Sequence, residues 1–133
     1  MAETVVVFGT FDGLHEGHRA FFREAKACAD RLVVVVARDV TVQLLKGRPV
    51  RYSEQTRMEM VRREPAVDEV RLGDAVLGSY AVLKEVHPRV VAVGYDQDTL
   101  LEDLTRWKET HMPDIRLVRL SAYKPEQYKS SLL

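Results

Sequence analysis

The sequence predicts an α/β protein built on a doubly wound, five-stranded parallel sheet. Five short runs of apolar, largely β-branched residues recur along the chain, and segments with helical spacing separate them. In the runs at 4–8, 32–37 and 90–93 nearly every position is apolar, whereas strands of a sheet with one face in water would alternate apolar and polar residues. Strands buried on both faces, as in a parallel sheet covered by helices, have this continuous pattern.

The predicted strands cover residues 4–8, 32–37, 67–72, 90–93 and 115–120. The first predicted helix covers residues 17–29, with Ala20, Phe21, Ala25 and Cys28 on one face. Ser53 is the expected N-cap of the next helix, which ends before Pro65. Two further helices are expected over residues 79–86 and 99–109, where His87-Pro88 and Met112-Pro113 end them.

Composition limits the classes of function. The 133 residues are 46% hydrophobic, which predicts one domain over residues 1–133 with a single core. The 20 basic and 20 acidic residues balance, so nothing in the overall charge favours nucleic acid or a membrane surface as partner. Cys28 is the one cysteine and has no internal disulfide partner. No signal-like or membrane-spanning run is present, so we expect a cytoplasmic protein.

The most informative motif is His15-Glu16-Gly17-His18, which lies where the first strand passes into the first helix. Backbone N–H groups at a helix N-terminus favour an anion, and the helix dipole adds to this effect. Two imidazoles and the Thr10 hydroxyl bring further donors, while Gly9 permits close approach of the backbone. The motif therefore predicts a phosphate site; a tight turn with two surface histidines is the alternative.

A second polar segment, Gly94-Tyr95-Asp96-Gln97, closes the fourth predicted strand. In doubly wound sheets ligands bind outside the carboxyl ends of the strands, at the point where the strand order reverses. We therefore expect this segment and the two histidines to face one crevice.

Gly9-Thr10-Phe11-Asp12 followed by His15-Glu16-Gly17-His18 resembles the signature of the nucleotidyltransferase superfamily, a Gly-Thr-Phe-Asp stretch followed by His-x-Gly-His. Other segments follow in that family's order: 37–39, 46–49, 54–61, 67–68, 72–73 and 94–97. Within the superfamily the chain resembles archaeal-type FAD synthases, which are FMN adenylyltransferases, and next the glycerol-3-phosphate cytidylyltransferases. Tyr95, where cytidylyltransferases more often carry a second acid, favours the flavin branch.

The resemblance implies a Rossmann-like nucleotidyltransferase fold and roles for individual residues. Around the triphosphate it places Gly9, Thr10, Phe11, His15, Gly17 and His18, with His15, His18 and Lys46 as the catalytic residues. Lys46 and Arg57 are expected to be mobile cations that contact substrate phosphates. Gly94 and Asp96 are expected in the nucleoside pocket, and Ser130 and Ser131 are expected to hold the β- and γ-phosphates, although Lys129-Ser130-Ser131 departs from the family's Ile-Ser-Ser/Thr-Thr pattern.

Structural alternatives remain for several of these residues. The stretch containing Lys46, Arg48 and Arg51 also fits a solvated basic loop, and Arg57 also fits a surface ion pair with Glu54 or Glu59.

Two acidic residues have alternatives of their own. Asp12 fits a substrate or Mg²⁺ contact and the cap of a turn equally well. Asp96 also fits a simple N-cap of the following helix.

The predicted reaction is FMN + ATP → FAD + pyrophosphate, in which the substrate phosphate attacks the α-phosphorus in line. A cytidylyltransferase that uses CTP and glycerol 3-phosphate, or a similar phospho-alcohol, is the nearest alternative. A nucleotide-binding module without turnover is the alternative from another class. We expect Mg²⁺ or another divalent cation to arrive with the nucleotide, and the protein to form a homodimer that binds neither nucleic acid nor membrane. The sequence leaves the ligands of that metal unknown.

Overall fold

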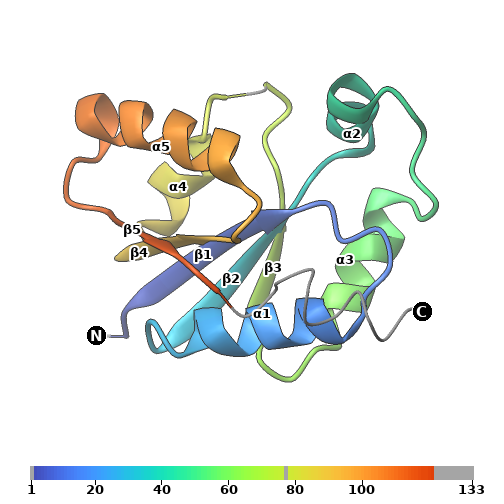
Figure 1. Ribbon diagram of the computed structural model, residues 1–133, viewed down its shortest axis with the longest axis horizontal. Coiled ribbons are helices and arrows are strands. Elements are labelled where there is room, and N and C mark those ends of the chain that lie inside the picture. Colours follow the sequence, from blue (N-terminus) through green and yellow to red (C-terminus); the bar gives the residue numbers. More distant parts are fainter. Residues whose placement is uncertain (1, 77, 122–133) are drawn as a thin grey trace.

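Five parallel strands form one sheet in the order β3-β2-β1-β4-β5 (Figure 1). The computed structural model describes residues 2–76 and 78–121. Its strands are β1 Thr4–Gly9, β2 Arg31–Val36, β3 Glu69–Leu72, β4 Val90–Val93 and β5 Arg116–Arg119. All five predicted strands are therefore confirmed, and their boundaries differ from the predicted ones by at most two residues.

The two sides of β1 are paired to different extents. Strand β1 pairs with β2 over its whole length, from Thr4 opposite Arg31 to Gly9 opposite Val36. Its pairing with β4 covers only Val5 opposite Val90 and Val6 opposite Val91. The strand order reverses between β1 and β4, and the ladder between them stops before their carboxyl ends. This is the position at which doubly wound sheets form a ligand crevice.

Helices cover both faces of the sheet (Figure 1). Helices α1 (Glu16–Lys26) and α3 (Glu54–Arg62) cover one face, while α4 (Ala81–Val86) and α5 (Asp98–His111) cover the other. Side chains of β1 alternate between the two cores, because Val5 and Val7 pack with α1 and α3 whereas Val6 packs with α4 and α5. Burial on both faces explains why nearly every position of the strand is apolar.

Each of the predicted helices is present, and the predicted capping of α3 is confirmed. The Ser53 hydroxyl oxygen accepts a hydrogen bond from the backbone N–H of Thr56 at 3.3 Å. In the part of the chain that the structure describes, no helix is both long enough and apolar enough to cross a membrane.

The sequence analysis missed α2 (Asp39–Lys46). This helix ends at Gly47, whose φ of 66° is a left-handed conformation that glycine adopts without strain. Only Val42 is buried, so the helix has no wide apolar stripe from which it could be recognised. Lys46, for which a solvated basic loop was the structural alternative, is the last residue of this helix.

Phe11 fixes the course of the chain after β1. Its φ of 53° is unusual for a non-glycine residue, and its buried ring lies against Gly9. A Cβ atom built on Gly9 would lie 2.5–2.9 Å from three atoms of this ring. Gly9 is therefore required by the aromatic ring above it.

We predict that Gly9→Ala lowers the free energy of unfolding by about 2–3 kcal/mol, because the methyl group overpacks against the Phe11 ring. Gly47→Ala is the matched control: its Cβ would meet nothing within 4 Å, so only the left-handed backbone penalty of about 1 kcal/mol applies. Urea denaturation measures both. A Gly9→Ala protein no less stable than Gly47→Ala would contradict the packing argument.

Candidate functional site

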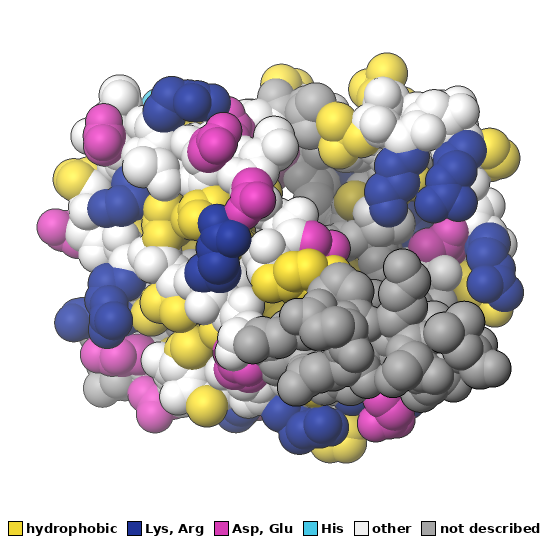
Figure 2. All heavy atoms as spheres, viewed as in Figure 1, with side chains coloured by type: hydrophobic (Ala, Val, Ile, Leu, Met, Phe, Trp, Pro, Cys, Tyr) yellow, Lys and Arg dark blue, Asp and Glu magenta, His cyan; other side chains and the backbone are white. Residues whose placement is uncertain are grey.

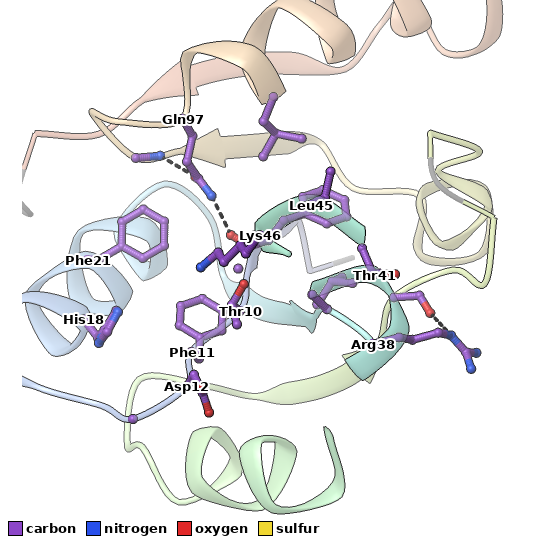
Figure 3. Close-up of a pocket in the computed structure, with 18 of the residues that line it drawn as sticks. Thr10, Phe11, Asp12, His18, Phe21, Arg38, Thr41, Leu45, Lys46 and Gln97 are labelled. Atoms are coloured by element: carbon purple, nitrogen blue, oxygen red, sulfur yellow. Dashed lines mark hydrogen bonds between the residues drawn. The ribbon is translucent and has the colours of Figure 1, made fainter. Parts of the chain in front are cut away.

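A cleft of about 980 Å³ opens at the carboxyl ends of the strands (Figure 3). The segments that follow β1, β2, β3 and β4 line it, together with α2 and the first turns of α1 and α5. Among the predicted site residues, these line the cleft: Gly9, Thr10, Phe11, Asp12, His15, His18, Lys46, Gly94 and Asp96. The segments after the first and fourth strands thus face one cleft, as predicted.

The two histidines cap the N-terminus of α1 reciprocally. His15 Nδ1 accepts a hydrogen bond from the backbone N–H of Gly17 at 3.0 Å, and His18 Nδ1 accepts one from the N–H of His15 at 3.3 Å. This is the geometry of a capping box, with imidazoles in place of the usual hydroxyl and carboxylate. A ring nitrogen that accepts an N–H bond carries no proton, so each neutral imidazole carries its proton on Nε2.

His18 is neutral at physiological pH. Burial lowers the pKa of its imidazole from the ordinary 6.5 to about 4, and the nearby His15 and Arg19 add to this shift. The ring of Phe11 lies edge-on to it, with 5.6 Å between the ring centroids. His18 is therefore suited to act as a fixed Nε2–H donor, and positive charge for a phosphate has to come from another residue.

Lys46 provides such a charge. It lies at the end of α2, and its side chain points into the cleft on the side where Thr10 and His18 lie (Figure 3). The C-terminal end of a helix dipole favours a cation at this position. Lys46 is exposed, as a mobile cation should be. Arg57, for which the same role was predicted, differs.

The structure corrects the interpretation of Arg57. Its side chain is fully buried in α3, and its guanidinium donates hydrogen bonds to the carbonyls of Tyr52 at 3.0 Å and Thr10 at 2.8 Å and to Asp39 Oδ1 at 2.6 Å. Neither a mobile cation nor a surface ion pair with Glu54 or Glu59 describes this geometry. Arg57 is a fixed brace that joins the segment after β1 to α2 and α3.

Asp12 connects two of the segments that Arg57 joins, the one after β1 and the one before α3. Its Oδ2 and Oδ1 accept hydrogen bonds from the backbone N–H groups of Arg51 at 2.7 Å and Tyr52 at 2.8 Å. Burial alone would raise the pKa of Asp12, but these bonds and the charges of Arg57 and Arg51 outweigh it and lower the pKa. Both oxygens are thus used in capping a turn. The predicted turn cap is therefore confirmed, and the alternative of a contact with Mg²⁺ stays a prediction.

Two glycines have packing roles that the sequence did not reveal. The space above Gly9 holds the Phe11 ring, as described above. A Cβ on Gly94 would lie 3.3 Å from Asp96 Oδ1 and 3.5 Å from Gln97 Oε1. Gly9 and Gly94 therefore lie close to side chains of the protein itself. The sequence analysis explained both glycines only by the approach of a ligand.

Gln97 is a residue whose importance the sequence analysis missed. Its Oε1 accepts a hydrogen bond from the N–H of Gly94 at 2.7 Å, and its Nε2 donates to the carbonyl of Phe8 at 3.0 Å (Figure 3). The amide thereby joins the carboxyl ends of β1 and β4 beyond the point where their ladder stops. The sequence signal that could have indicated this role is a glutamine three residues after Gly94, the glycine that follows the fourth strand.

Asp96 lies beside this bridge and lines the cleft. The N-cap of α5 is Gln97, and no side-chain hydrogen bond caps this helix. The alternative of Asp96 as a simple N-cap is therefore wrong.

Two further expectations concern residues at the C-terminus and a metal. Ser130 and Ser131 lie outside the described residues. Among the residues that the structure describes, no group of three or more His, Cys, Asp or Glu side chains is placed to hold a metal ion.

Comparison with known proteins agrees with this geometry. The family model described as "Cytidylyltransferase-like" matches residues 6–131. The FAD synthase of Pyrococcus horikoshii is 38% identical over 128 residues, which are 96% of this chain and 86% of that protein. The FAD synthase of Methanopyrus kandleri is 42% identical over 127 residues, 93% and 83% of the two chains. The crystal structure of a lipopolysaccharide core biosynthesis protein from Thermoplasma volcanium superposes with a TM-score of 0.85 at 31% identity, covering 93% of this chain and all of that one.

We predict that Arg57→Leu lowers the free energy of unfolding by about 3 kcal/mol, since it leaves two backbone carbonyls and Asp39 without their donor. Arg62→Leu is the matched control in the same helix, because the Arg62 side chain is half exposed and pairs with Glu59. We expect a change below about 0.5 kcal/mol there. Urea denaturation measures both, and equal stabilities of the two variants would contradict the role of the brace.

We predict that the free energy of unfolding falls as the pH is lowered from about 6.5 to about 4, in part because of His18. Its pKa is lower in the folded than in the unfolded protein, so the unfolded state binds more protons in this window. An imidazole titration followed by NMR should give a pKa below 5 for His18. In His18→Gln the pH dependence of stability should be weaker, and an unchanged dependence would contradict the assignment.

Proposed function

Because this chain belongs to the cytidylyltransferase-like family, we propose that it is an FAD synthase, an enzyme that transfers the adenylyl group of ATP to FMN. An oxygen of the FMN phosphate forms a bond to the α-phosphorus of ATP. The bond from the α-phosphorus to the bridging oxygen breaks, and pyrophosphate leaves with that electron pair. FAD and pyrophosphate are the products, and the reaction needs no covalent enzyme intermediate.

The observation that carries this proposal is the reciprocal capping of α1 by His15 and His18. It fixes two Nε2–H donors where a strand passes into a helix, beside the positive end of the helix dipole. Adenylyl transfer asks the protein mainly to position two anions and to stabilise charge that grows on the phosphate oxygens. Donors that are already oriented do this without reorganisation at the moment of reaction.

The remaining roles follow from the arrangement of the cleft. Lys46 supplies a positive charge to the phosphates from the end of α2. Asp96 and Gly94 form the side of the cleft that receives the nucleoside, and Gln97 holds the two strand ends at a fixed distance. We keep Mg²⁺ as a cation that arrives bound to the triphosphate.

The choice of adenylyl transfer to FMN over the alternatives rests on the relatives. The two curated relatives named above match this chain over most of its length and are FAD synthases, which favours ATP and FMN over CTP and a phospho-alcohol. The intact histidine pair favours an enzyme over a binding module, because binding alone does not need donors aimed at a transition state. A homodimer, a cytoplasmic location and the absence of nucleic-acid binding stay predictions from the sequence.

A pyrophosphate-release assay tests the proposal. ATP and CTP are each combined with FMN and with glycerol 3-phosphate, in the presence of Mg²⁺. We expect release only from ATP with FMN, together with formation of FAD. Release from CTP with glycerol 3-phosphate would replace the proposed substrates, and nucleotide binding without any turnover would refute the enzyme.

We predict that His18→Ala lowers kcat more than about a hundredfold and changes the KM for ATP far less, because its donor acts most strongly in the transition state. Loss of one oriented donor costs about 2.7–4 kcal/mol in comparable sites. His111→Ala is the matched control, since His111 is an exposed residue at the end of α5 and does not line the cleft. Equal losses in nucleotide affinity and kcat would contradict this role.

A further inference from the structure

We propose that the ring system of FMN binds in the half of the cleft next to β2 and β3, between Leu45 of α2 and Val76 of the segment that follows β3. This inference rests on the proposed function, because it takes FMN as the acceptor. It assigns the side chains that distinguish a flavin phosphate from a small phospho-alcohol.

The exposed hydrophobic side chains are concentrated at this place. Among the described residues, the exposed large hydrophobic residues are Val40, Leu44 and Leu45 of α2 and Val76, with exposed fractions of 56%, 72%, 64% and 68%. Figure 2 shows hydrophobic side chains at the surface on the upper right, where Figure 1 places α2. Single exposed hydrophobic residues are common, but their confinement to two neighbouring segments beside a cleft indicates a binding surface.

Helix α2 directs only some of these side chains into the cleft. Thr41 and Leu45 are four residues apart and lie on one face of the helix, and both line the cleft (Figure 3). Val40 and Leu44 form the neighbouring stripe, and neither lines it. Leu45 therefore belongs to the substrate side of the helix, while Leu44, one residue away, does not.

Val76 forms the facing wall. It lines the same cleft as Leu45, although 31 positions separate the two residues along the chain. Val35 at the end of β2 and Gly73 after β3 line the cleft between these segments. This half thus combines apolar side chains with a few polar ones: Arg38 donates to the carbonyl of Gly73, and Asp74 accepts from the Ser79 hydroxyl. Pockets for flat aromatic ring systems combine the two kinds of side chain in this way.

The order of chemical groups matches FMN. FMN carries an apolar ring system at one end and a phosphate at the other. In α2 the apolar Leu45 directly precedes Lys46, and both line the cleft. A ring beside Leu45 therefore places the phosphate within the region of the Lys46 ammonium and the two histidines. The nucleoside has its own side of the cleft near Gly94 and Asp96, so this half remains for the acceptor.

The experiment compares Leu45→Ala and Val76→Ala with the matched control Leu44→Ala. Affinity for FMN is measured by quenching of flavin fluorescence on the intact chain without nucleotide, and the KM values for FMN and ATP are measured in the pyrophosphate assay. We expect Leu45→Ala and Val76→Ala to weaken FMN binding about tenfold, in the range for lost apolar contacts in a pocket. The KM for ATP should stay within about twofold, and Leu44→Ala should bind FMN like the wild type.

Four outcomes would overturn the proposal. In the first, Leu44→Ala weakens FMN binding as much as Leu45→Ala, so the cleft-facing stripe has no special role. In the second, all FMN affinities are equal and the α2 variants change the oligomeric state, which makes this surface an interface between copies of the chain. In the third, the wild type neither binds nor adenylates FMN, and then the proposed function fails as well. In the fourth, the wild type adenylates FMN and Leu45→Ala binds FMN with unchanged affinity. This result overturns the proposed ring site and leaves the proposed function standing.

Discussion

The buried guanidinium of Arg57 is the interaction on which the shape of the cleft depends. It joins the carbonyls of Thr10 and Tyr52 and the carboxylate of Asp39, and so it connects the segment after β1, the start of α3 and the start of α2. These hydrogen bonds compensate for the burial of a permanent charge, which would otherwise be strongly unfavourable. The brace is therefore satisfied only when the three segments are in place together.

Because Arg57 is used in this brace, the buried and the exposed positive charges of the site have different roles. Arg57 uses its positive charge inside the protein, and His18 is held neutral, so neither supplies an exposed cation to the cleft. Lys46 takes this role from the end of a helix whose only buried residue is Val42. The net charge of the chain is zero, and the attraction for an anion is consequently local.

The opposite side of the cleft depends on Gln97. Parallel strands normally continue their ladder, but β1 and β4 stop pairing after Val6 and Val91. The Gln97 amide then provides one acceptor and one donor, as a backbone peptide group would, and joins Gly94 to Phe8. The crevice at the reversal of strand order thus has a defined width, although the strands that border it are not paired there.

The sequence by itself determined the five strands, most of the helices and the position of the histidine motif at the mouth of the cleft, because apolar periodicity, capping residues and prolines act over a few neighbouring residues. It also placed His15 and His18 at the first helix, since their capping bonds span two and three residues. Only the tertiary structure decided that Arg57 is a brace and Asp12 a cap. Their partners lie 47 and 40 residues away along the chain, at Thr10 and Tyr52 respectively, and no local pattern records contacts that folding alone brings together.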